Sequence, residues 1–306
     1  MSALPAAQEP PPDALGRIVS FMRDFSVEAT RPSEGDLAAL SVLKPGTRVY
    51  LSAVPNRPAD ENLTTAIRLR ASGFEPVPHI AVRNFPSGDA LDDFLARLNG
   101  EAGVVRVLVI AGDRAEHGPF RAAVDAIDSG ALRRRGMRTV GIAGYPDGHP
   151  RIGADELNRA LGRKIAAAEA TGLAVEIVTQ FCFDAGRMLD FVAQLRSFGF
   201  DHPVRTGLAG PTSLTALMRY AGRCGVRASA QALAQRSGLI RQMFAQATPD
   251  DLVRALAQTA TAGISPHFFS FGGVAATGRW ARAVADGHIV LEGSEGFRVE
   301  PPQREI

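Results

Sequence analysis

The chain has 306 residues, of which 45% are hydrophobic and 22% are charged, which is the composition of an ordinary globular protein. Its 34 basic and 32 acidic residues leave a net charge of +2, so no strong field favours nucleic acid or an anionic membrane as a partner. The two cysteines, Cys182 and Cys224, stand far apart and outside any metal-binding spacing, so we expect free thiols and no metal site.

The first residues, MSALPAAQEPPPD, have neither the basic part nor the apolar part of a secretion signal. No apolar run approaches the roughly 20 residues of a membrane-spanning helix. We therefore expect a cytoplasmic protein. We also expect residues 1–14 to form a flexible segment ahead of a single domain over residues 15–306.

Short apolar runs alternate with longer amphipathic stretches along the rest of the chain. Several of the short runs are apolar on both faces, as strands buried in a parallel sheet should be. In chain order, the expected strands are Phe25–Thr30, Arg48–Ala53, Glu75–Ile80, Arg106–Asp113, Thr139–Tyr145, Val175–Phe183, Val204–Leu208 and His267–Phe271.

Apolar residues at three- and four-residue spacing predict helices between these strands. The expected helices are Asp60–Ala71, Gly88–Leu98, Phe120–Leu132, Ala154–Ala170, Ala185–Phe198 and Ser213–Cys224. Residues suited to cap helix starts are Asp13, Ser33, Ser87 and Thr212. A further helix opens at Pro249, and residues 287–298 predict a short hairpin.

Eight strand–helix alternations predict an α/β fold, a closed (βα)8 TIM barrel with extra helices between the seventh and eighth strands. The competing fold is an open Rossmann-like sheet. It is disfavoured because no GxGxxG turn follows any expected strand. In a barrel of this kind the chemistry lies at the carboxyl ends of the strands, so the polar residues there are the candidates for function.

Glu28 and Asp113 are the acidic candidates. Glu28 lies inside an apolar strand, where a carboxylate is costly to bury without a partner. It is either a general acid with a raised pKa or a structural residue paired with a nearby arginine such as Arg31. Asp113 follows an apolar run and a glycine, which suits either an acceptor at a strand terminus or a helix cap.

The other strand-end residues leave their alternatives open. His79 follows two prolines in PVPHI and is, taken alone, more typical of a satisfied core histidine. Gln180 suits either a substrate clamp or a buried strand position. The Gly272–Gly273 pair either binds a phosphate or simply forms a tight turn. A hydrolase is disfavoured because the chain has no GxSxG elbow and no HExxH motif.

Three stretches together resemble the methylenetetrahydrofolate reductase family. They are Phe25-Ser-Val-Glu28, Ala143-Gly-Tyr145-Pro-Asp-Gly-His149-Pro150 and Thr179-Gln180-Phe-Cys-Phe-Asp184, with Pro78-His79 and Gly112-Asp113 between them in the family's order. The resemblance implies a (βα)8 barrel that holds FAD at the strand ends, takes electrons from NADH or NADPH, and passes hydride to 5,10-methylenetetrahydrofolate to give 5-methyltetrahydrofolate.

The resemblance also implies roles for individual residues. Glu28 matches the glutamate that protonates the folate, and Asp113 matches the aspartate near the flavin and the pterin. The substrate-binding positions are Gln180 and Tyr220. The positions expected to hold FAD are Ser52, His79, Gly112, Asp113, Tyr145, His149 and Lys164.

The chain departs from the family's pattern in the residues that follow Glu28, in a five-residue longer connection between Lys164 and Gln180, and at two single positions. Ala111 stands where the family commonly has an arginine, and Ala216 stands where a glutamine is expected. Two alternatives within the class follow: a flavin-free reductase that uses NADH directly, and an enzyme that runs in the oxidative direction in one-carbon catabolism. Outside the class, the alternatives are a barrel lyase, disfavoured by the lack of a strand-terminal lysine, and a non-catalytic folate-binding protein. The sequence leaves open whether the chain forms a homo-oligomer.

Overall fold

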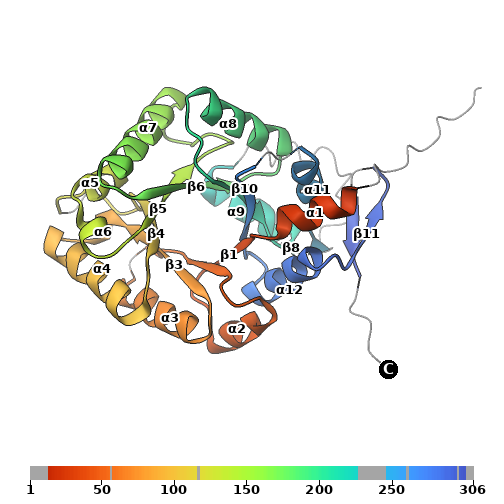
Figure 1. Cartoon of the computed structure of the whole chain (residues 1–306), viewed down its shortest axis with the longest axis horizontal. Coiled ribbons are helices and arrows are strands. Elements are labelled where there is room, and N and C mark those ends of the chain that lie inside the picture. Colours follow the sequence, from red (N-terminus) through yellow and green to blue (C-terminus); the bar gives the residue numbers. More distant parts are fainter. Residues whose placement is uncertain are drawn as a thin grey trace, which may run out of the picture.

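Eight parallel strands close into a barrel in the computed structural model, which describes residues 13–55, 57–115, 118–226, 246–259, 262–294 and 296–300 (Figure 1). The strands follow one another around the barrel as β1-β10-β7-β6-β5-β4-β3-β2. The predicted (βα)8 TIM barrel is thereby confirmed. The strand bounds are β1 Ser26–Ala29, β2 Arg48–Leu51, β3 Glu75–Ala81, β4 Arg106–Ile110, β5 Thr139–Gly144, β6 Ala174–Phe181, β7 Val204–Ala209 and β10 Ile264–Phe269.

Helices surround the barrel on its outer side (Figure 1). Apart from α9, which packs in a separate cluster with Phe181 and Phe183, their apolar faces pack on the outward residues of the strands in one large core. The helix bounds are α1 Ala14–Met22, α2 Glu34–Ala39, α3 Asp60–Ala71, α4 Gly88–Ala102, α5 Ala123–Asp128, α6 Ala131–Arg134, α7 Ala154–Ala170, α8 Ala185–Ser197, α9 Leu214–Cys224, α11 Asp250–Thr259 and α12 Val274–Ala285, with short 3-10 turns at Leu40–Val42 and Val82–Asn84.

Two expectations about local structure were wrong. The helix expected over Phe120–Leu132 is two short helices, because Gly130 takes a left-handed conformation with φ of +71° and breaks the helical path. The strand expected to reach Asp113 ends at Ile110, so Asp113 lies in the following loop. Asp113 is exposed there, free of the constraint that a strand position would impose.

The predicted caps are correct at two helices. Ser33 and Ser87 accept hydrogen bonds from backbone N–H groups in the first turns of α2 and α4. Asp13 makes no such bond at α1, and Ser213 rather than Thr212 caps α9. Thr212 instead belongs to the two-residue strand β8 (Thr212–Ser213), which pairs with β9 (Gln246–Ala247).

Extra helices lie between the seventh and eighth barrel strands, as predicted. They are α9 and α11, while residues 227–245 and 260–261 of this region lie outside the described residues. The predicted C-terminal hairpin is also present, as β11 (Ile289–Glu292) paired antiparallel with β12 (Gly296–Val299). Of the expected 1–14 segment, residues 1–12 fall outside the description and Ala14 already begins α1.

A buried ion-pair network fills the barrel at the start of the strands. Arg205 donates from Nε to Glu176 at 2.8 Å, and Arg48 donates from Nη1 to the same oxygen at 3.3 Å. Glu75 accepts from both Arg48 and Arg106, at 3.3 and 3.2 Å. The side chains of Arg205 and Glu176 are 1% and 6% exposed, so each charge depends on its partners.

An apolar layer separates this network from the far end of the barrel. It consists of Tyr50, Val77, Leu108 and Val178, one residue from each of four strands. Tyr50 also donates from its hydroxyl to Glu176 at 2.8 Å, which joins the apolar layer to the ion pairs below it. The remaining inward positions, at the carboxyl ends of the strands, carry the candidate functional residues.

Both cysteines are free thiols, as predicted. In the described part of the chain, no helix has the length and apolar character needed to cross a membrane.

Candidate active site at the carboxyl ends of the strands

The carboxylate of Glu28 lies at the centre of a polar cluster at the end of β1. Its Oε1 accepts from the Ser52 hydroxyl at 2.5 Å. Its Oε2 lies 3.3 Å from His267 Nε2 and 3.6 Å from His79 Nε2. Because the Glu28 side chain is only 11% exposed, these three groups from β10, β3 and the end of β2 replace most of the water around it.

The surroundings of Glu28 lower its pKa from the ordinary 4.5 to about 2. Burial alone raises this pKa, but the charge of His79, the hydrogen bond and charge of His267, and the bond from Ser52 together outweigh burial. Burial lowers the pKa of His79, with Glu28 opposing.

This result corrects both expectations for Glu28. Its pKa is lowered rather than raised, because the imidazole and hydroxyl groups around it stabilise the charged form. Its partner is not Arg31, whose Nε lies 3.7 Å from Glu61 instead.

His267 is the functional candidate that the sequence analysis missed. It is fully buried, and its Nδ1 lies 2.9 Å from the hydroxyl of Ser26, which accepts from Arg205 Nη1 at 3.3 Å. The expected eighth strand began at His267, but β10 begins at Ile264. A strand that starts at Ile264 places His267 in its interior rather than at its first position, and a polar residue inside an apolar strand is the signal that could have found it.

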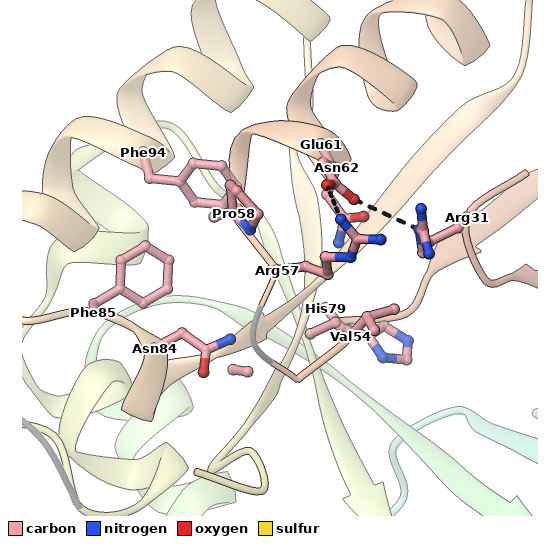
Figure 2. Close-up of a pocket in the computed structure, with 13 residues that line it drawn as sticks. Arg31, Val54, Arg57, Pro58, Glu61, Asn62, His79, Asn84, Phe85 and Phe94 are labelled. Carbon is pink, nitrogen blue, oxygen red and sulfur yellow. Dashed lines mark hydrogen bonds and ion pairs between the residues drawn. The ribbon is translucent and has the colours of Figure 1, made fainter.

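A pocket opens beside the cluster, between the segments that follow β1, β2 and β3 (Figure 2). His79 lies at one side of it, and Glu61 lies between the guanidinium groups of Arg31 and Arg57, at 3.7 and 3.4 Å. Arg31 has a φ of +52°, a conformation that few residues other than glycine adopt. The wall opposite is apolar, formed mainly by Phe85 and Phe94.

Asp113, Tyr145 and His149 form a second group. The Tyr145 and His149 rings meet edge to face with centroids 5.2 Å apart. Burial and then the charge of Asp113 raise the pKa of Tyr145. Burial and then Arg151 lower the pKa of His149, and Asp113 opposes them. The Asp113 carboxylate therefore acts on both rings.

The thiol of Cys224, at the end of α9, connects the two acidic candidates. Burial raises its pKa most, and the charges of Glu28 and Asp113 raise it further, with Arg223 opposing. Both carboxylates thus act on one side chain above the barrel. Glu28, in β1, and Asp113, in the loop after β4, both belong to the carboxyl-terminal side of the barrel strands.

Similarity to known proteins agrees with this arrangement. The family model described as methylenetetrahydrofolate reductase matches residues 60–246, more than half of the chain. The chain belongs to the methylenetetrahydrofolate reductase family. "Methylenetetrahydrofolate reductase 2" of Saccharomyces cerevisiae is 27% identical over 157 residues, which cover 49% of this chain and 26% of the yeast protein. The chain thus matches about a quarter of that relative's length.

Two solved structures resemble the chain at low identity. Dihydropteroate synthase from Thermus thermophilus has a TM-score of 0.47 and 16% identity, covering 88% of this chain and 94% of the synthase. Dihydropyrimidinase from Brevibacillus agri has a TM-score of 0.38 and 11% identity, covering 61% of this chain and 46% of the other.

Three other residues named from the family resemblance lie on different elements from the Glu28 cluster. Gln180, on β6, accepts from the backbone N–H of Phe181 at 3.0 Å. Tyr220, on α9, stacks on Phe271 with centroids 4.1 Å apart. Gly112 has a φ of +88°, and a side chain there would meet Ala81. These residues lie at or above the ends of their strands.

Lys164 lies apart from these residues, on α7. It is half-buried, and burial lowers its pKa to about 8. Its ammonium has no ion-pair partner within the described ranges.

The cluster at the mouth fits a flavin of the kind that the reductase family uses. The buried His79 Nε2 makes no hydrogen bond to any described residue, so a donor or acceptor is open to a ligand. Apart from this cluster, the partly buried cation of Lys164 on α7 suits a phosphate. No cluster of His, Cys, Asp and Glu side chains among the described residues is arranged to hold a metal ion.

Proposed function

We propose that this chain interconverts 5,10-methylenetetrahydrofolate and 5-methyltetrahydrofolate by hydride transfer, with FAD as the carrier and NADH or NADPH as the nicotinamide partner. The observation that carries the proposal is the Glu28 carboxylate at the end of β1, held by Ser52 and two imidazoles in a chain of the reductase family. In the reductive direction, the methylene compound, NAD(P)H and one proton give the methyl compound and NAD(P)+.

Glu28 handles that proton. In the reductive direction, the bond between the methylene carbon and the folate N10 breaks, and N10 gains a proton. In the oxidative direction, N10 loses it. Because Glu28 is a carboxylate in the free protein, it is ready to accept a proton from N10, whereas the reductive direction first requires proton uptake from solvent. The same residue serves both directions, because the forward and reverse reactions share one transition state, and the oxidative direction is the second candidate for the physiological role.

Asp113 and α9 supply the environment for the reaction. The negative charge of Asp113 stabilises the positive charge that develops on the substrate as the methylene bridge opens. A cluster of aromatic side chains lies against α9, and it excludes water from the reacting atoms. The rings of this cluster are Phe181, Phe183, Tyr220, Phe269 and Phe271.

FAD would be held by His79, by the loop residues Gly112 and Asp113, and by Tyr145 and His149, with Ser52 nearby and Lys164 toward the phosphates. When bound, the flavin supplies hydride transfer between the nicotinamide and the folate. The flavin-free reductase is the second candidate for the cofactor. Ala111 favours it, because this position lacks a guanidinium that would bind the FAD phosphates.

The test is a visible absorption spectrum of the purified protein, followed by anaerobic titration with each folate. The proposal predicts a flavin spectrum that bleaches with 5-methyltetrahydrofolate or NADH and recovers with 5,10-methylenetetrahydrofolate. Folate turnover without a flavin band would establish the flavin-free alternative. No reaction with either folate, flavin added or not, would contradict the proposed function.

A further inference from the structure

The two imidazoles beside Glu28 occupy different surroundings. His79 lines the pocket, and its Nε2 makes no hydrogen bond in the described structure (Figure 2). His267 is 0% exposed, is not among the residues that line the pocket, and uses both ring nitrogens within the protein. A ligand in the pocket can touch His79, but His267 can act on a ligand only through Glu28.

Hydrogen bonding determines which nitrogen of His267 carries the proton. The hydroxyl of Ser26 accepts from Arg205 and has one hydrogen to donate, for which Nδ1 is the acceptor at 2.9 Å. Because the Glu28 carboxylate can only accept, Nε2 carries a hydrogen and donates it to Glu28 at 3.3 Å.

Buried charged groups fix the positions of Ser26 and His267. Arg205, which anchors Ser26, is fixed by Glu176 at 2.8 Å. Tyr50 packs edge to face on His267 with centroids 4.6 Å apart and also donates to Glu176. The ionisable groups acting with His267 are thus Glu28, His79, Tyr50 and Arg205. Those acting on Glu28 are His267 and His79, and Glu28 in turn acts on Cys224.

We propose that His267 is a positioning residue, which fixes the orientation of the Glu28 carboxylate and keeps it anionic in the free protein. A proton that Glu28 takes from a substrate nitrogen breaks the N–H bond and forms an O–H bond on the carboxyl group. The proton then passes from the carboxyl group to solvent, which restores the carboxylate, and His267 retains its Nε2–H throughout. The role in turnover rests on the proposed function, whereas the effect on Glu28 exists without any substrate.

The test measures the titration of the Glu28 carboxyl directly, by 13C NMR of protein labelled at glutamate side chains, with Glu28→Gln to assign the signal. His267→Gln supplies an amide N–H that can replace the Nε2–H donor but cannot titrate, and His267→Leu supplies no donor. We expect the Glu28 pKa to stay within about one unit of the wild-type value in His267→Gln and to rise by more than one unit in His267→Leu.

Two further variants supply a second test of the Glu28 titration and a control for it. Ser26→Ala removes the anchor of the ring at little cost in volume, and it should also raise the Glu28 pKa, which decides the matter if His267→Leu fails to fold. His202→Leu, at a partly exposed histidine paired with Glu169, should leave the Glu28 titration unchanged. An unchanged titration in both His267→Leu and Ser26→Ala would overturn the proposal. So would a folded His267→Gln that behaves like His267→Leu.

The pH profile of folate turnover provides the second readout. In the oxidative direction, the acid limb should move to higher pH in His267→Leu and return toward the wild-type position in His267→Gln, because the base is protonated earlier without the donor. A lower rate at every pH with an unmoved limb would contradict a positioning role. Absence of folate turnover in the wild type would defeat the proposed function alone, since the NMR titration needs no substrate.

Discussion

His267 Nε2 lies 3.3 Å from Glu28 Oε2, although 239 positions of the sequence separate the two residues. They meet because β1 pairs with β10, which places Ser26 beside His267 and Glu28 beside Phe269. This pairing is the contact that closes the barrel between its first and last strands. Barrel closure and completion of the acidic cluster are therefore the same structural event.

Glu28→Gln should abolish most folate turnover while leaving ligand binding in place. Glutamine has nearly the same shape but cannot exchange a proton with N10, and loss of a positioned acid–base group costs about 100- to 10,000-fold in rate. Reduction of the flavin by NADH should survive. Separate stopped-flow measurements of the two half-reactions test this, and full folate activity in the variant would refute the assigned role of Glu28.

Asp113→Asn should slow the folate half-reaction more than the nicotinamide half-reaction. The substitution removes a negative charge that stabilises the cationic substrate, an effect of about tenfold or more when a charge faces the reacting atoms. The matched control is Asp155→Asn, at an exposed aspartate in the first turn of α7. Equal losses in the two half-reactions would indicate damage to flavin binding instead.

Glu28 should make the folded state sensitive to acid. Its folded pKa of about 2 is below the ordinary 4.5, so its stabilising contribution is complete above pH 4.5 and is lost as the pH falls toward 2. The shift corresponds to about 3 kcal/mol. Urea unfolding over this pH range should show a shallower loss of stability in Glu28→Gln than in the wild type. Parallel curves for the two proteins would argue against the lowered pKa.

Glu176→Gln should destabilise the fold strongly. Glu176 neutralises Arg205 and Arg48 where water is largely excluded, and removal of one member of a buried ion pair costs about 3–5 kcal/mol. The control is Glu101→Gln, which breaks a half-exposed pair with Arg97 and should cost less than about 1 kcal/mol. Chemical denaturation of both variants measures the difference, and similar losses in the two would contradict the prediction.

Lys164→Gln should weaken FAD binding if the ammonium faces the cofactor phosphates. Loss of one charge-assisted contact should raise the dissociation constant roughly tenfold, which equals about 1.4 kcal/mol. Lys44→Gln, at an exposed lysine paired with Asp286, serves as the control. Flavin fluorescence during titration of the apoprotein measures both constants. An unchanged constant for Lys164→Gln would remove this residue from the proposed flavin site.

The sequence was sufficient for the barrel and for naming candidate residues near the ends of its strands. The alternation of apolar runs with amphipathic stretches depends on local periodicity, and each strand lies close to its expected place. Glu28 and His79 were recognisable because a polar side chain near the end of an apolar strand is unusual by itself. Asp113 was found for the same reason, although its strand ends three residues earlier than expected.

The amino-acid sequence by itself determined the order of strands and helices, because side-chain periodicity is a property of neighbouring residues. Only the tertiary structure decided that His267 stands behind Glu28, that Arg31 pairs with Glu61, and that the Glu28 pKa falls rather than rises. The pKa of a buried carboxyl depends on the charges and donors that closure brings within a few ångströms, and those come from strands far apart in the chain.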